Sequence, residues 1–547
     1  MTVHQDLIAT VLALGVLAAA APLAAQRARP DSLRGNTPAY EIAYVFEART
    51  PAGHEATVRL RIGGALGDST FIQLPAWYPG RYAIYNFAAN VQEVYASCDG
   101  RSVPAAKRDK QTWVVRCKAP RQGRATIEFT LGVWWNDLNG STSQIDSLHI
   151  NLNPGNVFPY VVGHKPDPVT VTYSGPDGWT VMNGAVESPW PGPVTQRFPN
   201  YDVFIDHPTE ISARFTVDTF SVERTPYRVA LHAEGDTGVG MRGRLSSDLK
   251  QIVQAVVAMW GVQPMERYAF LVHYVPGNRG GGDGMEHLTS TQIITAAPLA
   301  DSAAYLARLE VFAHEFFHTW SMKRLRAKEL GPWDYTRETY TTTLWVGEGF
   351  TNYYGARMVY RAGLWDQARY LGRAAANIAE LQATPGRLVM SAEEASLSAW
   401  LFDRVPLRQQ ANLRNSAISY YTKGEALAWL LDLEVRARTG GEKTLDDVMR
   451  LLWQRFWNGA TTTYYLQGHG YGGDDVRQAL NDVTQTDFGE FFHRYVERTE
   501  ELPYGWTLGR VGLRLVSDAG SSTYRIETDP DAPEDARHLG GAWLEGR

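Results

Sequence analysis

Two histidines and a glutamate form the segment with the clearest chemistry. His314 and His318 stand four positions apart, with Glu315 directly after the first, in a mostly apolar run between Tyr305 and Trp320. On a helix, residues at i and i+4 project from one face, so both imidazoles can reach the same Zn²⁺. Glu315 lies about 100° around the helix, where its carboxylate can take a proton from a water and later protonate a leaving amine. A helix with two merely packed histidines is the alternative, but it would bury Glu315 without a partner.

A catalytic zinc site needs a third protein ligand and one open position. The metzincin spacing would place a histidine at position 324, where this sequence has Arg324, so that class is excluded. Among the acidic residues that follow, Glu348 is the best choice, because it lies in a largely apolar stretch, 344–354, where a carboxylate needs a charge partner. Glu338 is the second choice, and Asn352, one turn after Glu348, could orient a ligand. We therefore expect one Zn²⁺ per chain, held by the two histidines and Glu348.

The elements around this segment change character along the chain. Residues 40–46, 57–62 and 126–131 alternate with period two between Gly and Pro residues, which predicts an N-terminal antiparallel β-sandwich over 36–215. We expect the catalytic domain over 216–500, with an amphipathic helix, a buried strand and then mostly helices. These elements are predicted at 246–260, 268–275, 302–323, 341–362, 365–382, 422–438, 444–457 and 473–482.

Composition sets limits on function. The 547 residues include 53 Lys+Arg and 59 Asp+Glu, a net charge of −6, so the chain has no general electrostatic reason to bind nucleic acid or anionic lipid. Charged residues at 20% and hydrophobic residues at 44% are globular values, which excludes a disordered, collagen-like or coiled-coil chain. Only two cysteines exclude a disulfide-rich scaffold and a cysteine-built zinc finger, so histidines and carboxylates must hold any metal.

The N-terminus resembles a targeting segment. Residues 7–21 are almost entirely apolar and are followed by small residues, which predicts a signal peptide over 1–25, although the usual basic residues before it are missing. An uncleaved anchor is the alternative. We expect a periplasmic or secreted protein with no stable membrane insertion after cleavage. Export would permit a Cys98–Cys117 disulfide stapling a hairpin, and two free buried thiols are the alternative.

Several further segments share their pattern with a known family. Together with the His-Glu-x-x-His motif, they resemble the glycyl aminopeptidase family of gluzincin zinc metallopeptidases. The resemblance implies a multidomain α+β protein with a thermolysin-like catalytic domain and a mostly helical C-terminal lobe. It also implies the two-histidine, one-glutamate zinc site. The segments that carry it are residues 74–82, 314–320, 323–326, 330–335, 344–351, 421–424 and 439–441.

The resemblance also implies residues that bind the substrate. In related aminopeptidases a Gly-x-Met-Glu strand lines the cleft, so Glu286 would bind the free α-amine, and the backbone at Gly284 and Met285 would pair with the peptide. Asp283 interrupts the glycine run in this sequence, a difference from the family that is expected to alter the substrate pocket. From the residues alone, a surface loop with a solvated Glu286 is an equal interpretation.

The same resemblance implies an oxyanion donor. The tyrosine of a Tyr-x-Lys-Gly segment donates its hydroxyl to the tetrahedral intermediate in related enzymes, which points to Tyr421. Tyr420 is adjacent and remains an alternative. A tyrosine that only packs in the core is the simpler interpretation of either residue.

These features predict an exported zinc aminopeptidase that acts on peptides with a free N-terminus, with Glu315 as general base. A preference for small N-terminal residues, Gly or Ala, comes from the resemblance. A zinc endopeptidase is the alternative if Glu286 does not face the cleft. A second alternative is a non-catalytic protein that binds peptide or glycan through Trp77 and Tyr78. The oligomeric state stays open.

The last segment, 501–547, has strand and turn character and is too short for a domain with its own core. Family members commonly continue into a C-terminal PDZ domain. Residues 541–544 look like the opening of one, so we expect a truncated, PDZ-like tail.

Overall fold

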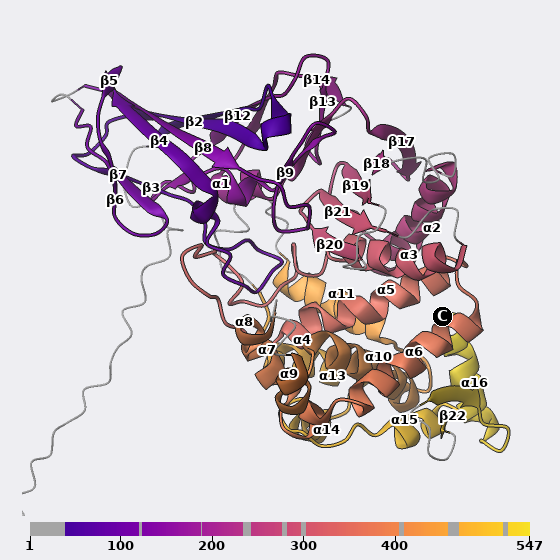
Figure 1. Ribbon diagram of the computed structural model, residues 1–547. Helices are drawn as coiled ribbons and strands as arrows, with labels where there is room; N and C mark the ends of the chain where they lie inside the picture. The colour runs from indigo at the N-terminus through magenta and orange to yellow at the C-terminus, as the bar shows by residue number, and fades with distance from the viewer. Residues whose placement is uncertain are drawn as a thin grey trace, which may run out of the picture.

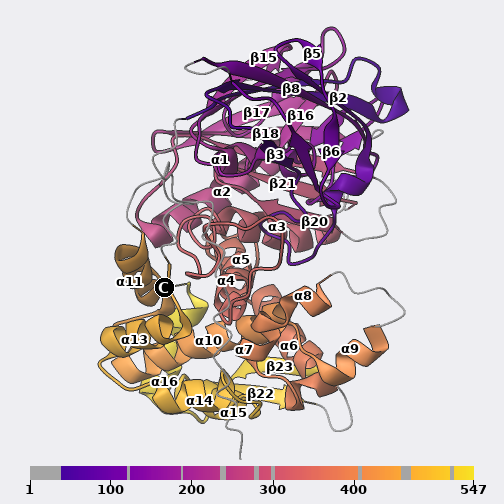
Figure 2. The ribbon, with the colours of Figure 1, turned by 90° about the vertical axis from the view of Figure 1, so that its left-hand side faces the viewer.

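The computed structural model describes residues 39–119, 123–186, 189–233, 242–275, 282–296, 302–403, 410–457, 470–517 and 523–546. The predicted signal peptide lies outside these residues. A β-rich domain, a mixed sheet with two helices and a helical lobe follow one another from top to bottom in Figure 2. The C-terminal segment lies on the helical lobe (Figure 1).

The β-rich domain contains three sheets. Its largest sheet has the order β15-β12-β1-β2-β8-β4-β5, and alternate residues of β1 are buried, as the period-two pattern predicts. The prediction of an antiparallel sandwich is wrong in one pairing, because β1 runs parallel to β12. The bounds are β1 (Glu41–Glu47), β2 (Glu55–Gly64), β4 (Val91–Cys98), β5 (Arg101–Ser102), β8 (Ala125–Trp134), β12 (Val169–Ser174) and β15 (Val194–Phe198).

Two smaller sheets and one short helix complete this domain. One sheet has the order β14-β13-β16-β10-β9 and the other β11-β3-β7-β6. The bounds are β3 (Thr70–Gln73), β6 (Ala105–Lys107), β7 (Thr112–Val115), β9 (Gln144–Ile145), β10 (Ile150–Leu152), β11 (Tyr160–Val161), β13 (Thr180–Met182), β14 (Trp190–Pro191), α1 (Tyr201–Ile205) and β16 (Thr209–Ser212).

The two cysteines form a disulfide rather than two free thiols. Cys98 ends β4, and Cys117 follows β7, with 5.5 Å between the Cα atoms. The sequence predicted a disulfide within a hairpin. Because β4 and β7 belong to different sheets, the bond instead joins two sheets of the domain.

The second part is a five-stranded sheet with the order β17-β18-β19-β21-β20. The three inner strands are parallel and the two edge strands antiparallel. β19 is buried along its whole length, as expected for an inner parallel strand. The bounds are β17 (Thr216–Val222), β18 (Thr225–Ala233), α2 (Arg242–Trp260), β19 (Tyr268–Tyr274), β20 (Gly282–Glu286), β21 (Ser290–Thr295) and α3 (Ser302–Phe317).

The helical lobe confirms most of the predicted helices. The stretch 341–362 is an exception, because it forms two helices that meet at Glu348. The bounds are α4 (Leu344–Gly347), α5 (Gly349–Arg361), α6 (Gln367–Gln382), α7 (Ala392–Leu397), α8 (Ala399–Phe402), α9 (Gln410–Ser416), α10 (Tyr420–Thr439), α11 (Leu445–Phe456), α13 (Gly473–Thr484) and α14 (Gly489–Tyr495).

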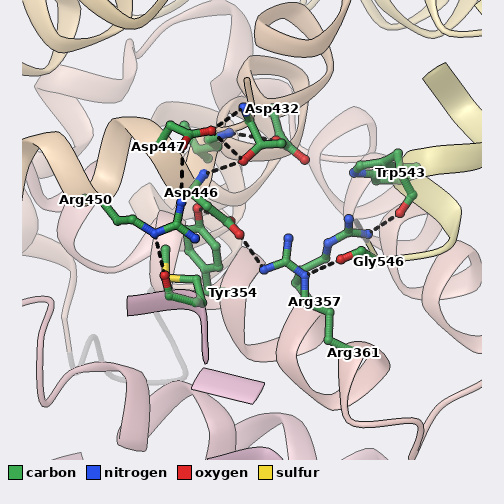
Figure 3. Close-up of polar contacts among 12 residues, drawn as sticks. Tyr354, Arg357, Arg361, Asp432, Asp446, Asp447, Arg450, Trp543 and Gly546 are labelled. Atoms are coloured by element: carbon green, nitrogen blue, oxygen red, sulfur yellow. Dashed lines mark hydrogen bonds and ion pairs between the residues drawn. The ribbon is translucent and has the colours of Figure 1, made fainter. Parts of the chain in front are cut away.

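The C-terminal segment packs on this lobe. The Arg357 guanidinium donates to the Trp543 carbonyl oxygen at 2.7 Å, and Arg361 pairs with Asp446 at 2.7 Å and donates to the Gly546 carbonyl oxygen at 2.9 Å (Figure 3). Residues 541–544 therefore end a helix on the lobe, and the expected PDZ-like module is not confirmed. The bounds are α15 (Tyr504–Arg510), β22 (Leu513–Ser517), β23 (Tyr524–Thr528) and α16 (Glu534–Leu544).

Among the residues described, none of the helices is both long and apolar enough to cross a bilayer.

Candidate active site

The three predicted metal ligands, His314, His318 and Glu348, lie close together. The Nε2 atoms of His314 and His318 lie 2.9 Å apart. The Oε2 atom of Glu348 lies 3.2 Å from the His318 Nε2 atom and 3.7 Å from that of His314. Glu338 is not part of this group; it stays in the loop before α4. The three ligands thus converge, as the sequence predicts, from one helix and from the α4–α5 junction.

Local structure explains the placement. The two histidines fall on one face at the C-terminal end of α3, and α3 packs against α5. Glu348 stands between α4 and α5, and its backbone is helical, so the two helices share it as a junction. The break turns its side chain toward α3, and only 2% of the residue is exposed.

The donor set fits a divalent cation. Burial and the charge of His318 lower the pKa of His314 to about 4. Burial would also lower the pKa of His318, but the charge of Glu348 outweighs it and raises that pKa to about 9. Two imidazoles and one carboxylate facing a common point are the ligand set of thermolysin-type zinc sites.

Outer contacts orient each ligand. The His318 Nδ1 atom lies 3.2 Å from the Ser321 carbonyl oxygen, so a proton on Nδ1 leaves Nε2 free. Asn352 lies close enough to the His314 ring to raise the pKa of that ring, against the larger lowering by burial, and its orienting role stays a prediction. The hydroxyl of Tyr82 donates to the second oxygen of Glu348 at 3.2 Å.

Glu315 lies beside the ligands and has an oxygen without a protein partner. The residue is 7% exposed, and within the described residues its Oε2 atom has no hydrogen bond. Burial raises its pKa well above the usual range, and the neighbouring charge of Glu286 adds to this. A Cβ atom at Gly284 would lie 2.1 Å from the other oxygen of Glu315, so only glycine lets β20 pass this close.

The strand β20 brings Glu286 to the same place. Ligand atoms of Glu286, Glu315 and His318 all lie within 4.8 Å of one another. Glu286 is 6% exposed, and among the described residues it forms no ion pair with a Lys or Arg side chain, although the His318 ring lies within 4.8 Å of it. Its carboxylate oxygens lie against the backbone of Gly80, since a Cβ there would be 3.1 Å from both. A buried carboxylate in this position calls for a cation from outside the chain.

The other two residues of the predicted strand differ in role. The Met285 side chain is fully buried, and its sulfur packs against Gly80, so Met285 can reach a ligand only through its backbone. β20 is an edge strand, which leaves one side of its backbone without a neighbouring strand.

The Asp283 carboxylate is held by the β-rich domain. Its carboxylate pairs with Arg81 of the β-rich domain and accepts from the Gly140 N–H at 2.8 Å. The Arg81 guanidinium also donates to the Gly284 carbonyl oxygen at 2.8 Å. Asp283, the residue that interrupts the glycine run, therefore connects β20 to the β-rich domain.

The two adjacent tyrosines at the start of α10 are not equivalent. The Tyr421 ring centroid lies 6.4 Å from that of His314. Tyr420 is 7% exposed and packs edge-on against Tyr82 at 6.0 Å. Tyr421 thus faces the metal ligands, and both tyrosines border a cavity of about 490 Å³ that Asp403 also lines.

The roles of Arg81 and Tyr82 were not predicted. Both stand in the segment 74–82 that carried part of the family resemblance, but more than 200 residues separate them from β20 and Glu348. Sequence periodicity gives no information about contacts between residues this far apart. The density of aromatic residues in segment 74–82 was the one sequence feature that pointed to a functional role for it.

A second cluster joins the β-rich domain to the mixed sheet. The two oxygens of Glu210 bind separate rings, His149 Nδ1 at 2.8 Å and His273 Nε2 at 3.0 Å. His149 Nε2 lies 2.9 Å from the Gln144 amide oxygen, and the His232 ring stacks on His149 with 4.2 Å between centroids. Each Glu210 oxygen already has a partner, so the cluster is a hydrogen-bonded link between domains.

This cluster gives an acid-dependent stability. Burial, with the charges of His149 and His273, lowers the pKa of His232 to about 4, whereas the unfolded value is about 6.5. The stability it contributes is complete above about pH 6.5 and is lost as the pH falls toward 4, roughly 3 kcal/mol. We expect His232→Phe, which keeps a stacked ring, to flatten the fall in melting temperature between about pH 7.5 and 4. His493→Gln, at an exposed histidine, is the control, and equal falls in wild type and His232→Phe would contradict the prediction.

Comparison with known proteins supports these observations. A model of the M61 glycyl aminopeptidase domain matches residues 307–427, and a model of the M61 N-terminal domain matches residues 43–213. The two matches together cover more than half of the chain. No curated protein matches the sequence significantly.

Solved structures with a similar fold include an aminopeptidase N family protein from Idiomarina loihiensis. It has a TM-score of 0.77 and 26% identity, over 87% of this chain and 79% of that one. An M1 zinc metallopeptidase from Deinococcus radiodurans has a TM-score of 0.48 and 14% identity, over 85% of this chain and 96% of that one.

Proposed function

Because this chain belongs to the M61 glycyl aminopeptidase family and is a metallopeptidase, we propose that it removes the N-terminal residue from peptides in a zinc-dependent reaction. Membership in a peptidase family sets aside the alternative of a non-catalytic binding protein. One observation carries the proposal: the buried carboxylate of Glu286 lies within 4.8 Å of Glu315 and His318, next to the three converging metal ligands.

Each residue of the site has its own role in the reaction. His314, His318 and Glu348 would hold Zn²⁺, which would supply a Lewis acid to polarise the scissile carbonyl and lower the pKa of water. Glu315 takes a proton from the water that attacks the carbonyl carbon. As the carbon–nitrogen bond breaks, the same carboxyl group gives that proton to the leaving nitrogen, which departs as an amine.

Two further groups select and stabilise the substrate. Glu286 pairs with the N-terminal ammonium, and the buried setting strengthens that pair and restricts cleavage to chain ends. Tyr421, whose ring faces His314, donates its hydroxyl to the carbonyl oxygen as negative charge develops there. β20 is the last strand in the order of its sheet, and an extended peptide would pair with its backbone at Gly284 and Met285, beside the Arg81 guanidinium that already binds the Gly284 carbonyl oxygen. The family resemblance supports Gly or Ala as the preferred first residue.

The experiment measures release of p-nitroaniline from glycyl, alanyl, leucyl and N-acetylglycyl substrates. We expect the zinc-loaded protein to cleave the glycyl and alanyl substrates fastest and the acetylated one far more slowly than any free-amine substrate. A chelator is expected to abolish turnover, and added Zn²⁺ to restore it. Cleavage of the acetylated substrate as fast as the glycyl one would favour an endopeptidase, and full activity after removal of zinc would contradict the proposed chemistry.

We also propose that the enzyme works outside the cytoplasm. The apolar segment 7–21 supports export, and the Cys98–Cys117 disulfide is of the kind that persists in oxidising compartments. Cell fractionation tests this, and recovery of the full-length chain in the cytoplasm with reduced thiols would contradict it.

A further inference from the structure

The two oxygens of Glu348 have different partners. Oε2 faces the Nε2 atoms of His318 and His314, at 3.2 and 3.7 Å. Oε1 points the other way and accepts a hydrogen bond from the Tyr82 hydroxyl at 3.2 Å. Glu348 is 2% exposed and Tyr82 is 3% exposed, so water does not readily replace this bond.

Tyr82 comes from the β-rich domain, in the loop that follows β3. Its ring packs edge-on against Trp400 of α8 and Tyr420 of α10, each at 6.0 Å between centroids. Its backbone N–H donates to the Asp403 carboxylate at 3.0 Å. The ring and the backbone are thus both held by the helical lobe, which fixes the direction of the hydroxyl.

The rest of this loop is attached to the catalytic part as well. The Ala76 N–H donates to the Tyr335 carbonyl oxygen at 2.8 Å, and the Trp77 indole N–H donates to the Asp334 carbonyl oxygen at 2.9 Å. The Trp77 ring also packs edge-on against Trp400 at 5.1 Å. These contacts precede Tyr82 by only a few residues, so the loop cannot move away from Glu348 without breaking them.

We propose that Tyr82 is a positioning residue for the metal site, supplied by the β-rich domain, which holds Glu348 so that a single oxygen faces the two histidines. A buried carboxylate oxygen without a donor is unfavourable, and a carboxylate free to rotate presents its oxygens to a metal less consistently. Hydrogen bonds to the ligands themselves typically contribute 10- to 100-fold to metal affinity. The β-rich domain is therefore part of the metal site and not only a neighbour of it.

The test is the affinity for Zn²⁺ itself, measured by competition with a chromophoric chelator, for wild type and Tyr82→Phe. It rests on the proposed zinc site but uses no substrate. We expect Tyr82→Phe to weaken Zn²⁺ binding about 10- to 100-fold. The zinc-free variant should fold but melt below wild type, because the substitution leaves the buried Oε1 atom of Glu348 without a donor. The absorption spectrum of the Co²⁺-loaded protein should also change, because the carboxylate is free to bind differently.

Tyr85→Phe is the matched control, because Tyr85 lies in the same loop, its ring stacks on Phe87, and within the described part of the chain its hydroxyl has no hydrogen bond to the three ligands. Its affinity should equal that of wild type. If Tyr82→Phe fails to fold, Asp403→Ala removes the backbone anchor of Tyr82 without touching Glu348 and should weaken binding in the same direction. Wild-type affinity in folded Tyr82→Phe would overturn this inference alone. Failure of the wild type to bind Zn²⁺ would overturn both this inference and the proposed function.

Discussion

Glu315→Gln is expected to lower kcat for glycyl p-nitroanilide by about 10²- to 10⁴-fold, the range typical of a lost general acid–base group. The amide keeps the size and the position beside Gly284 but cannot accept a proton from the attacking water. The zinc content should stay at the wild-type level, because Glu315 is not one of the three converging ligands.

Loss of activity alone would not separate chemistry from folding or metal loss, so zinc content and melting temperature belong to the same measurement. Glu338→Gln makes the same change at a carboxylate in the loop before α4 and should leave kcat unchanged. If Glu315→Gln keeps wild-type turnover with zinc bound, Glu315 is not the base. Another group would then have to be sought within the cleft.

Glu286→Gln is expected to lower kcat/KM for glycyl and alanyl substrates by about 10²-fold, mainly through KM. Removing one partner of a buried charge pair costs about 2–5 kcal/mol, and each 1.4 kcal/mol is tenfold. The free amine would meet an amide in place of a carboxylate. An acetylated substrate has no ammonium, so its already slow cleavage should not fall further.

The informative quantity is the ratio of free-amine to acetylated cleavage, which should collapse in Glu286→Gln and stay high in Glu338→Gln. Equal losses on both kinds of substrate would mean that Glu286 supports the structure and does not bind the amine. That result would also favour the endopeptidase alternative, because nothing else found near the ligands would then restrict cleavage to chain ends.

Part of the site follows from local geometry and could be predicted. The spacing of His314 and His318 places both rings on one helical face wherever that helix lies. Glu348 could be chosen because an apolar stretch that contains a carboxylate needs a partner for it. The structure brings these three together, and it places Glu286 within 4.8 Å of Glu315.

Other features depended on contacts between distant segments. The sequence predicts one continuous helix over 341–362, because this stretch contains no proline and keeps a helical pattern. In the structure the helix is broken at Glu348 into α4 and α5. The orientation of Tyr421, not Tyr420, toward His314 depends on how α10 packs, since adjacent residues on a helix point in different directions. The parallel pairing of β1 with β12 likewise joins strands more than 100 residues apart.

The sequence by itself determined the chemistry: which side chains can bind zinc, which can move a proton, and which family pattern they belong to. Tertiary structure alone decided which domain completes the site, because Tyr82 and Arg81 reach Glu348 and β20 across the domain boundary. Periodicity constrains neighbours within one element, whereas the approach of two elements is set by the packing of all the side chains between them. That is why the ligands could be named from the sequence and the groups that hold them could not.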